Sequence, residues 1–242
     1  MLTASDGILL KKTPYADNKY MLKILTPEKG IGTFSLKVSS SSRNSSMRSI
    51  LGQTLPLIHF VAYGKPDADI SSVRQMNIDV SYINIPHDFI RQSVAMFVNE
   101  MVLQTLRMPN RDETMYGFLK NALLHLDSGS VHLANYPLWF SVALARYLGI
   151  GPLMPSCEED IVFDLVSGSF MQSSALPGVQ LNPELSAMLL QFIIASDQIP
   201  DIVIDRKDRK ALLSFMIDFF SFHSDFDPQI RSADILHAVF RQ

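Results

Sequence analysis

The chain contains one cysteine, Cys157, and therefore cannot form an intrachain disulfide. It has no apolar run long enough to cross a bilayer, and even residues 185–195 are interrupted by polar side chains. Asp6 precedes the first apolar stretch and Lys11–Lys12 follow it, which is the reverse of the charge order in a signal peptide. We therefore expect a cytoplasmic protein that does not enter the membrane.

Catalytic and metal-binding motifs are missing as well. The six histidines have no metal-ligand spacing, and there is no phosphate loop, nucleophile elbow or paired-carboxylate motif. Residues 158–160 (EED) could bind a cation weakly, although a solvated loop is the favoured interpretation. The sequence predicts neither an enzyme nor a cofactor.

Charge is divided unevenly along the chain. Residues 1–80 contain ten Lys/Arg and six Asp/Glu, whereas residues 81–242 contain eleven and eighteen. The first part has the pattern of short strands and turns, and the second that of amphipathic helices. We expect a basic, anion-binding domain at residues 1–80 and an acidic, partner-docking domain at residues 81–242.

The first part alternates apolar and polar residues with the period of a strand. Strands are predicted near residues 7–12, 19–25, 31–38, 55–63 and 74–80. By this parity Leu22, Ile24 and Phe34 point inward, and Lys19, Lys23 and Lys37 point outward. Five short strands, each with one apolar face, suggest a small closed or nearly closed barrel.

A serine-rich segment, residues 39–48 (SSSSRNSSMR), separates the third and fourth strands. It has little to bury, so a mobile loop is expected. The loop is either a plain connector or a phosphate contact made by its two cations, Arg43 and Arg48.

Helices are expected in the second part, because apolar residues recur there at helical spacing between capping and breaking residues. A possible β-hairpin interrupts them around Ser167-Gly168, within an insertion at about residues 153–181. Asn182 and Asp205 have the character of N-caps. The predicted class is α+β, with two domains. The helices are expected near residues 89–107, 112–126, 137–148, 183–196, 206–223 and from 232 onward.

Four segments resemble the RecO family of bacterial DNA repair and recombination mediators. They are residues 7–19 (GILLKKTPYADNK), 26–30 (TPEKG), 144–152 (LARYLGIGP) and 230–236 (IRSADIL). Their order and spacing cover nearly the whole chain. The resemblance implies an N-terminal OB-fold and a helical C-terminal domain. It also implies a non-enzymatic role: binding single- and double-stranded DNA, annealing complementary strands and, with RecR, helping RecA displace single-strand binding protein (SSB).

The sequence departs from this family in two places. Many members hold zinc with two Cys-x-x-Cys pairs after the Leu-Gly-x-x-Pro helix end, but here Cys157 is followed three residues later by Asp160. Because a structural zinc site needs four ligands, we expect no zinc and a hairpin held by packing. Relatives also carry Lys-Gly-x-Arg-(Arg/Lys) after the third strand, where this chain has residues 37–41 (KVSSS). Fewer cations should weaken DNA binding.

The candidate DNA-binding residues are the cations of the predicted barrel and its loop. They could equally be a solvated face that keeps the protein soluble, and the resemblance favours DNA. They are Lys11, Lys12, Lys19, Lys23, Lys37, Arg43 and Arg48.

Partner-binding candidates lie in the helical part. RecR and the acidic, hydrophobic-ended tail of SSB are the expected partners, and the tail would dock in an apolar groove rimmed by cations. Each candidate could instead form a surface ion pair or belong to a solvated face. The candidates are Arg107, Lys120, Arg146, Arg206, Lys207, Arg209 and Lys210. A rival hypothesis is a protein-binding adaptor of the same complex with little DNA affinity.

Overall fold

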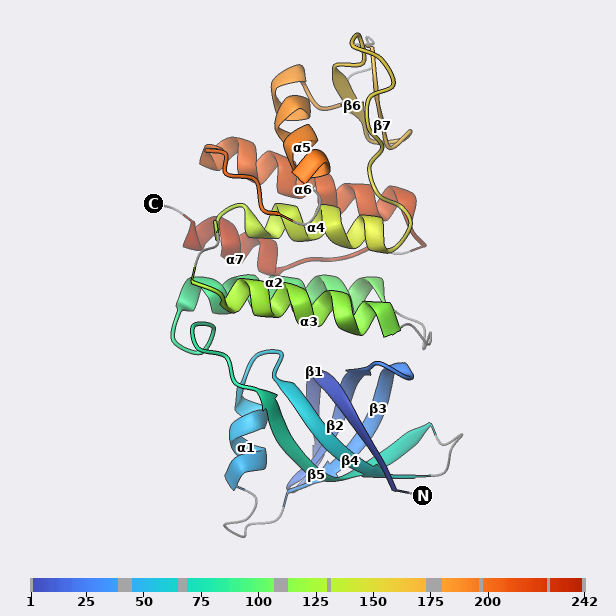
Figure 1. Ribbon diagram of the computed structural model, residues 1–242, viewed down its shortest axis with the longest axis vertical. Helices are drawn as coiled ribbons and strands as arrows, with labels where there is room; N and C mark the ends of the chain where they lie inside the picture. Colours follow the sequence, from blue (N-terminus) through green and yellow to red (C-terminus); the bar gives the residue numbers. More distant parts are fainter. Residues whose placement is uncertain are drawn as a thin grey trace. The chain divides into compact units, whose positions relative to one another are not determined.

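The computed structural model describes residues 2–38, 45–64, 69–106, 113–129, 132–172, 180–195, 198–225 and 227–240 (Figure 1). The chain folds into two compact units. The first contains Met1–Ala95 and Leu106–Gly129, and the second contains Met96–Thr105 and Ser130–Gln242. The first unit therefore extends beyond residue 80, where charge and pattern change, and the predicted domain boundary stays a prediction.

The first unit is built on a closed barrel of five strands in the order β1-β2-β3-β5-β4 (Figure 1). β1 is long enough to pair with both neighbours: its residues from Leu2 to Ile8 pair with β4 and those from Ile8 to Ala16 with β2. β3 and β5 run parallel and close the barrel. The predicted barrel is confirmed. Its strands are β1 (Leu2–Ala16), β2 (Lys19–Thr26), β3 (Gly30–Lys37), β4 (Leu57–Tyr63) and β5 (Ile70–Val80).

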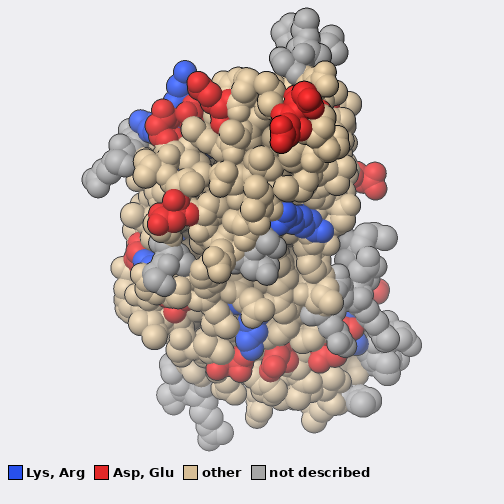
Figure 2. All heavy atoms as spheres, turned by 45° about the horizontal axis from the view of Figure 1, so that its top comes forward, with Lys and Arg blue, Asp and Glu red and all other residues tan. Residues whose placement is uncertain are grey.

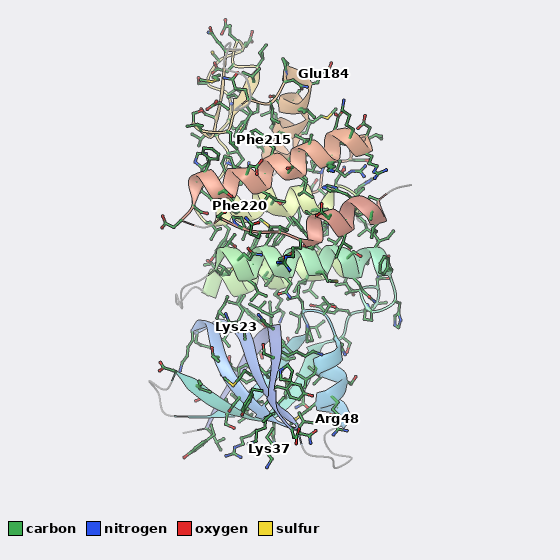
Figure 3. All side chains as sticks on the ribbon, turned by 180° about the vertical axis from the view of Figure 1, so that it is seen from behind. Lys23, Lys37, Arg48, Glu184, Phe215 and Phe220 are labelled. Atoms are coloured by element: carbon green, nitrogen blue, oxygen red, sulfur yellow. The ribbon has the colours of Figure 1, made fainter. Side chains whose placement is uncertain are left out.

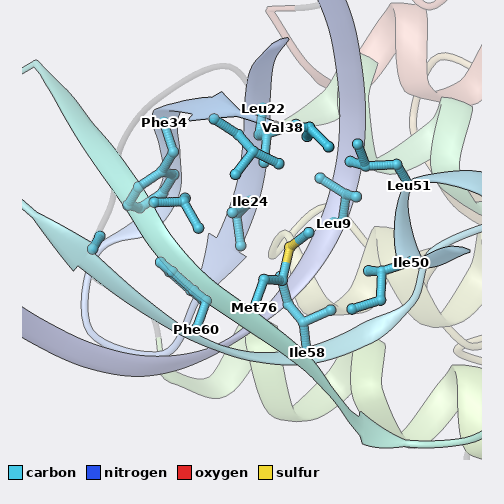
Figure 4. Close-up of a cluster of buried hydrophobic side chains, with 13 residues drawn as sticks. Leu9, Leu22, Ile24, Phe34, Val38, Ile50, Leu51, Ile58, Phe60 and Met76 are labelled. Carbon is cyan, nitrogen blue, oxygen red and sulfur yellow. The ribbon is translucent and has the colours of Figure 1, made fainter. Parts of the chain in front are cut away.

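The barrel is filled by the side chains that parity places inward (Figure 4). Leu22, Ile24, Phe34, Leu36 and Met76 are all buried there. Filling of this kind is expected, since a small barrel has just enough interior for its own side chains.

Helix α1 (Ser45–Gly52) corrects the expectation of a loop at residues 39–48. Its apolar residues Met47, Ile50 and Leu51 follow helical spacing, and Ile50 and Leu51 are buried in the barrel core. Residues 45–48 are therefore helical because burial of this apolar side outweighs the modest helix propensity of serine. Residues 39–44 lie outside the described part of the chain.

Helix α3 (Glu113–Asp127) also belongs to the first unit and contacts β1, β2 and β3. Its last residue, Asp127, accepts hydrogen bonds from the backbone N–H groups of Ile83, Asn84 and Ile85, at 2.7–2.8 Å. The carboxylate thus fixes the segment that connects β5 to helix α2 (Phe89–Thr105). Asp88 caps the start of α2 by accepting from the backbone N–H of Ile90 at 2.8 Å.

The second unit contains the C-terminal end of α2 and the remaining helices. Both predicted caps are confirmed: Asn182 Oδ1 accepts from Leu185 N and Asp205 Oδ1 from Asp208 N, each at 2.8 Å. Glu100 on α2 accepts from the backbone N–H of Ser232 at 2.8 Å, which fixes the start of the last helix. The helices are α4 (Tyr136–Tyr147), α5 (Pro183–Ala195), α6 (Arg206–His223) and α7 (Ser232–Val239).

The predicted hairpin is formed by β6 (Val162–Asp164) and β7 (Ser169–Met171). Phe163, fully buried, lies at the centre of a ring cluster with Phe170, Phe215 and Phe219, at centroid distances of 5.1, 5.9 and 6.1 Å. Cys157 is exposed, and no group of three or more potential metal ligands lies within the described residues. Aromatic packing is thus available to hold the hairpin against α6.

No helix within the described ranges is long and apolar enough to span a bilayer.

Candidate nucleic-acid interface

The outward face of β1, β2 and β3 carries four lysines on adjacent strands. Lys11 on β1 lies directly opposite Lys23 on β2, and Lys19 on β2 lies directly opposite Lys37 on β3. All four are exposed. We call them the lysine face.

A row of uncharged residues separates the two lysine pairs. Met21 in the middle of β2 lies between Thr13 on β1 and Ser35 on β3. Lys19 and Lys23 are four residues apart and thus about 13 Å along the strand, at about 3.3 Å per residue. Lys23 lies on the side of the barrel next to α3, and Lys37 lies on the side away from it (Figure 3).

Opposing lysines repel each other, and like charges directly across a sheet are destabilising. No side-chain hydrogen bond or ion pair joins the ammonium groups of the four lysines to any part of the chain that the structure describes. The repulsion is therefore not offset locally, and a polyanion that bridges the pairs would relieve it.

The other predicted DNA-binding cations lie elsewhere. Lys12 donates a hydrogen bond to the backbone carbonyl of Leu51 at the end of α1, so its ammonium group is directed toward that helix. Arg48 is exposed on α1 and not in a loop (Figure 3). Arg43 falls outside the described residues.

Arg74 and Tyr63 are additional candidates that sequence reasoning missed. Arg74 follows Val73, the last residue of β5 that pairs with β3, where it lies opposite Leu36. The Arg74 guanidinium lies 5.8 Å from the ring centroid of Tyr63, which is 53% exposed. An exposed aromatic ring beside cations is typical of single-strand binding surfaces. The pairing of β4 with β5, which sets Tyr63 opposite Ser72, brings this ring and Arg74 together, and no local sequence signal predicts that register.

Two of the partner-binding candidates already have partners within their own units. Lys120 forms an ion pair with Asp79 at 2.9 Å, and this contact raises the pKa of Lys120. Arg146 donates to the backbone carbonyl of Ile193 in the last turn of α5. Arg107 falls outside the described residues.

The cations at the start of α6 divide into two groups. Arg206, Lys207 and Lys210 are exposed. Arg209 instead donates to the carbonyl of Ile204 at 2.6 Å and lies over the ring of Phe240. Burial lowers the pKa of Arg209. Three cations of the cluster thus remain available to an anionic partner.

The charge asymmetry of the sequence persists in the compact units. The first has fourteen Lys/Arg and ten Asp/Glu, and the second has seven and fourteen. On the face shown in Figure 2, acidic and basic side chains lie in small groups, in places next to each other, on a largely uncharged surface. Because the barrel unit has the excess of cations, it is the unit that we expect to bind an anionic ligand.

Comparison with known proteins gives the same family across the whole chain. The family model for the recombination protein O N-terminal domain matches residues 1–82, and that for its C-terminal domain matches residues 86–229. A DNA repair protein RecO of Phocaeicola vulgatus is 26% identical over 241 residues, covering 99% of this chain and 100% of the relative. RecO proteins of Bacteroides fragilis and Porphyromonas gingivalis are 24% and 26% identical, with the same coverage of each chain.

Proposed function

Because the chain belongs to the RecO family of DNA repair proteins, we propose that it is a non-enzymatic recombination mediator. In this role it binds single- and double-stranded DNA and anneals complementary strands. With RecR it helps to load RecA onto SSB-coated single strands. The observation that supports DNA binding most directly is the lysine face, in which two pairs of lysines lie opposite each other on adjacent strands.

The lysine face would contact the phosphate backbone. Neutralising phosphates releases condensed counterions, which provides sequence-independent affinity. Thr13 and Ser35, in the row between the lysine pairs, add hydroxyl groups that can donate to phosphate oxygens. Bases of a strand held by its backbone stay accessible for pairing, as annealing requires.

Partner docking is assigned to the acidic, helical part of the chain. Arg206, Lys207 and Lys210 are exposed at the start of α6 and suit the acidic tail of SSB. RecR is the second proposed partner. We place the protein in the bacterial cytoplasm, associated with the nucleoid.

Fluorescence anisotropy of a labelled single strand, at low and near-physiological salt, tests this proposal. We expect micromolar binding. The logarithm of the association constant should fall with the logarithm of the salt concentration with a slope of about −3, for four phosphate contacts at about −0.7 each. A labelled duplex should also bind. Absence of binding even at low salt would contradict the mediator role.

The second candidate function is a protein-binding adaptor of the same complex with little DNA affinity. It is favoured by the net negative charge of the second unit and by the serines at residues 39–41. Binding to RecR without any binding to DNA would identify it.

A further inference from the structure

A hollow of about 280 Å³ opens at one end of the barrel. Ile50 and Leu51 of α1 fill the opposite end of the core, and Phe34 and Phe60 lie toward the hollow (Figure 4). It is lined by strand ends, by the β2–β3 turn and by two rings from within β3 and β4. The lining residues are Thr3, Ala4, Ser5, Thr26, Glu28, Lys29, Phe34, Phe60, Ala62, Gly64 and Ser71.

The hollow has an apolar floor and a polar rim. Phe34, Phe60 and Ala62 form the floor, and the two rings meet edge to face with centroids 5.0 Å apart. On the rim, the Ser5 hydroxyl lies 2.9 Å from Glu28 Oε2 and can donate to it. An apolar slot with a few polar groups at its edge suits a small planar ligand.

The β2–β3 turn that carries Glu28 and Lys29 is fixed by Thr26. The Thr26 hydroxyl donates to the carbonyl of Gly30 at 3.2 Å and accepts from the backbone N–H of Lys29 at 3.3 Å. The rim is therefore held in place before any ligand arrives.

We propose that this hollow receives one unstacked nucleobase of a single strand held on the lysine face, and that it prefers cytosine to thymine. The proposal rests on the proposed function, because it assigns a base-binding position to the same DNA-binding unit.

Strand β2 contributes residues to both the lysine face and the hollow. Lys23 is followed after three residues by Thr26 on the rim, about 10 Å along the strand. Lys29 then places a further cation beside the hollow. A strand whose phosphates lie on the lysine face would thus bring a base to the rim, and the volume admits a single base but no duplex.

Glu28 supplies the base preference. A carboxylate accepts a hydrogen bond from the N4 amino group of cytosine, whereas thymine presents its O4 acceptor at the same position. The rim hydroxyls of Ser5 and Ser71 can serve either base. Contact with the apolar floor is common to both, and Glu28 discriminates between them.

The first test is alanine-methyl NMR of the full chain titrated with dCMP and with dTMP. The methyl groups of Ala4 and Ala62 line the hollow, and Ala145, buried on α4, is the control probe. We expect shifts at Ala4 and Ala62 that saturate at lower dCMP than dTMP, with Ala145 unchanged. If neither nucleotide shifts Ala4 or Ala62, the proposal is overturned, even if DNA binds elsewhere.

The second test separates base binding from backbone binding. The affinity for a twelve-nucleotide oligo-dC is compared with the affinity for an abasic strand of equal length and charge. Both are measured for the wild type and for the Ser71→Phe variant, in which the ring fills the hollow. Since stacking of one base contributes about 5- to 150-fold in affinity, Ser71→Phe should lose that factor for oligo-dC and none for the abasic strand. Ser214→Phe, exposed on α6, is the matched control.

The Glu28→Gln variant tests the base preference without filling the hollow. Glu28 is exposed, so the change should leave the fold intact, and the ratio of oligo-dC to oligo-dT affinity should fall toward one. An unchanged ratio overturns the assigned preference. If the wild type binds neither oligo-dC nor the abasic strand, the proposed DNA-binding function fails, and the nucleotide titration still decides whether the hollow binds a base.

Discussion

Asn84 and Asp127 bind each other at two points. The backbone N–H of Asn84 donates to Asp127 Oδ1 at 2.8 Å, and its side-chain Nδ2 donates to the Asp127 backbone carbonyl at 2.6 Å. The carboxylate also accepts from the backbone N–H groups of Ile83 and Ile85. The end of α3 is thereby joined to the segment that leaves the barrel.

Removing this carboxylate should destabilise the first unit. Asp127→Ala leaves three backbone N–H groups without their acceptor, and we expect a loss of about 3 kcal/mol in the free energy of unfolding. Urea unfolding measures it. Asp69→Ala, at an exposed position in the same unit, is the control and should change stability by less than about 0.5 kcal/mol. Equal effects of the two changes would refute the joining role of Asp127.

The change of the first unit's stability with pH should depend on His125. Burial lowers the pKa of His125, so the folded state resists the proton that the unfolded state takes up below about pH 6.5. The stability that neutral His125 contributes is thus present above that pH. It is lost as the pH falls through the lowered pKa of the folded state. We expect His125→Gln to flatten the decline in unfolding free energy between about pH 7 and 5, measured by urea titration at each pH. An unaltered decline would count against this assignment.

Removing lysines from the lysine face should have opposite effects on DNA binding and on stability. In Lys19→Gln/Lys37→Gln, the salt slope for a single strand should become less steep by about 1.4, because two phosphate contacts at about 0.7 each are lost. Stability should rise slightly, because the like-charged pair is removed. Anisotropy and thermal melting measure the two effects. The control is Lys207→Gln/Lys210→Gln on α6, and the proposed site is wrong if this variant loses as much affinity.

The β6–β7 hairpin should depend on packing and not on metal. Phe163→Ala removes the ring at the centre of the aromatic cluster, and we expect a loss of about 3–5 kcal/mol. An excess of EDTA should leave the melting temperature of the wild type unchanged. Scanning calorimetry with and without the chelator measures both. A lower melting temperature in EDTA would reveal a structural metal and would overturn the packing explanation.

Strand parity and helix caps could be predicted because they depend on neighbouring residues alone. Leu22 and Lys23 point to opposite sides of the barrel as alternation requires, and Asn182 and Asp205 cap helices through atoms three residues away. Helix α1 was missed because serines hide the helical spacing of Met47, Ile50 and Leu51. Burial in a core built by other strands decides its structure.

The candidate site was predictable only in part for a similar reason. Parity identifies Lys19, Lys23 and Lys37 as outward, but strand register decides which lysines face each other. Arg74 meets Tyr63 through the pairing of β4 with β5, and Lys12 turns away to the end of α1. Long-range pairing of this kind leaves no mark in the local pattern.

The division of α2 has a practical consequence for anyone who wishes to produce half of this protein. Residues 89–95 belong to the first unit and residues 96–105 to the second, and the chain then returns to the first unit before entering the second again. Neither a fragment ending at residue 80 nor one starting at residue 81 contains a complete unit. Separate expression of the barrel unit would require a rearranged gene in which residues 106–129 are rejoined to residues 1–95 by a short designed linker.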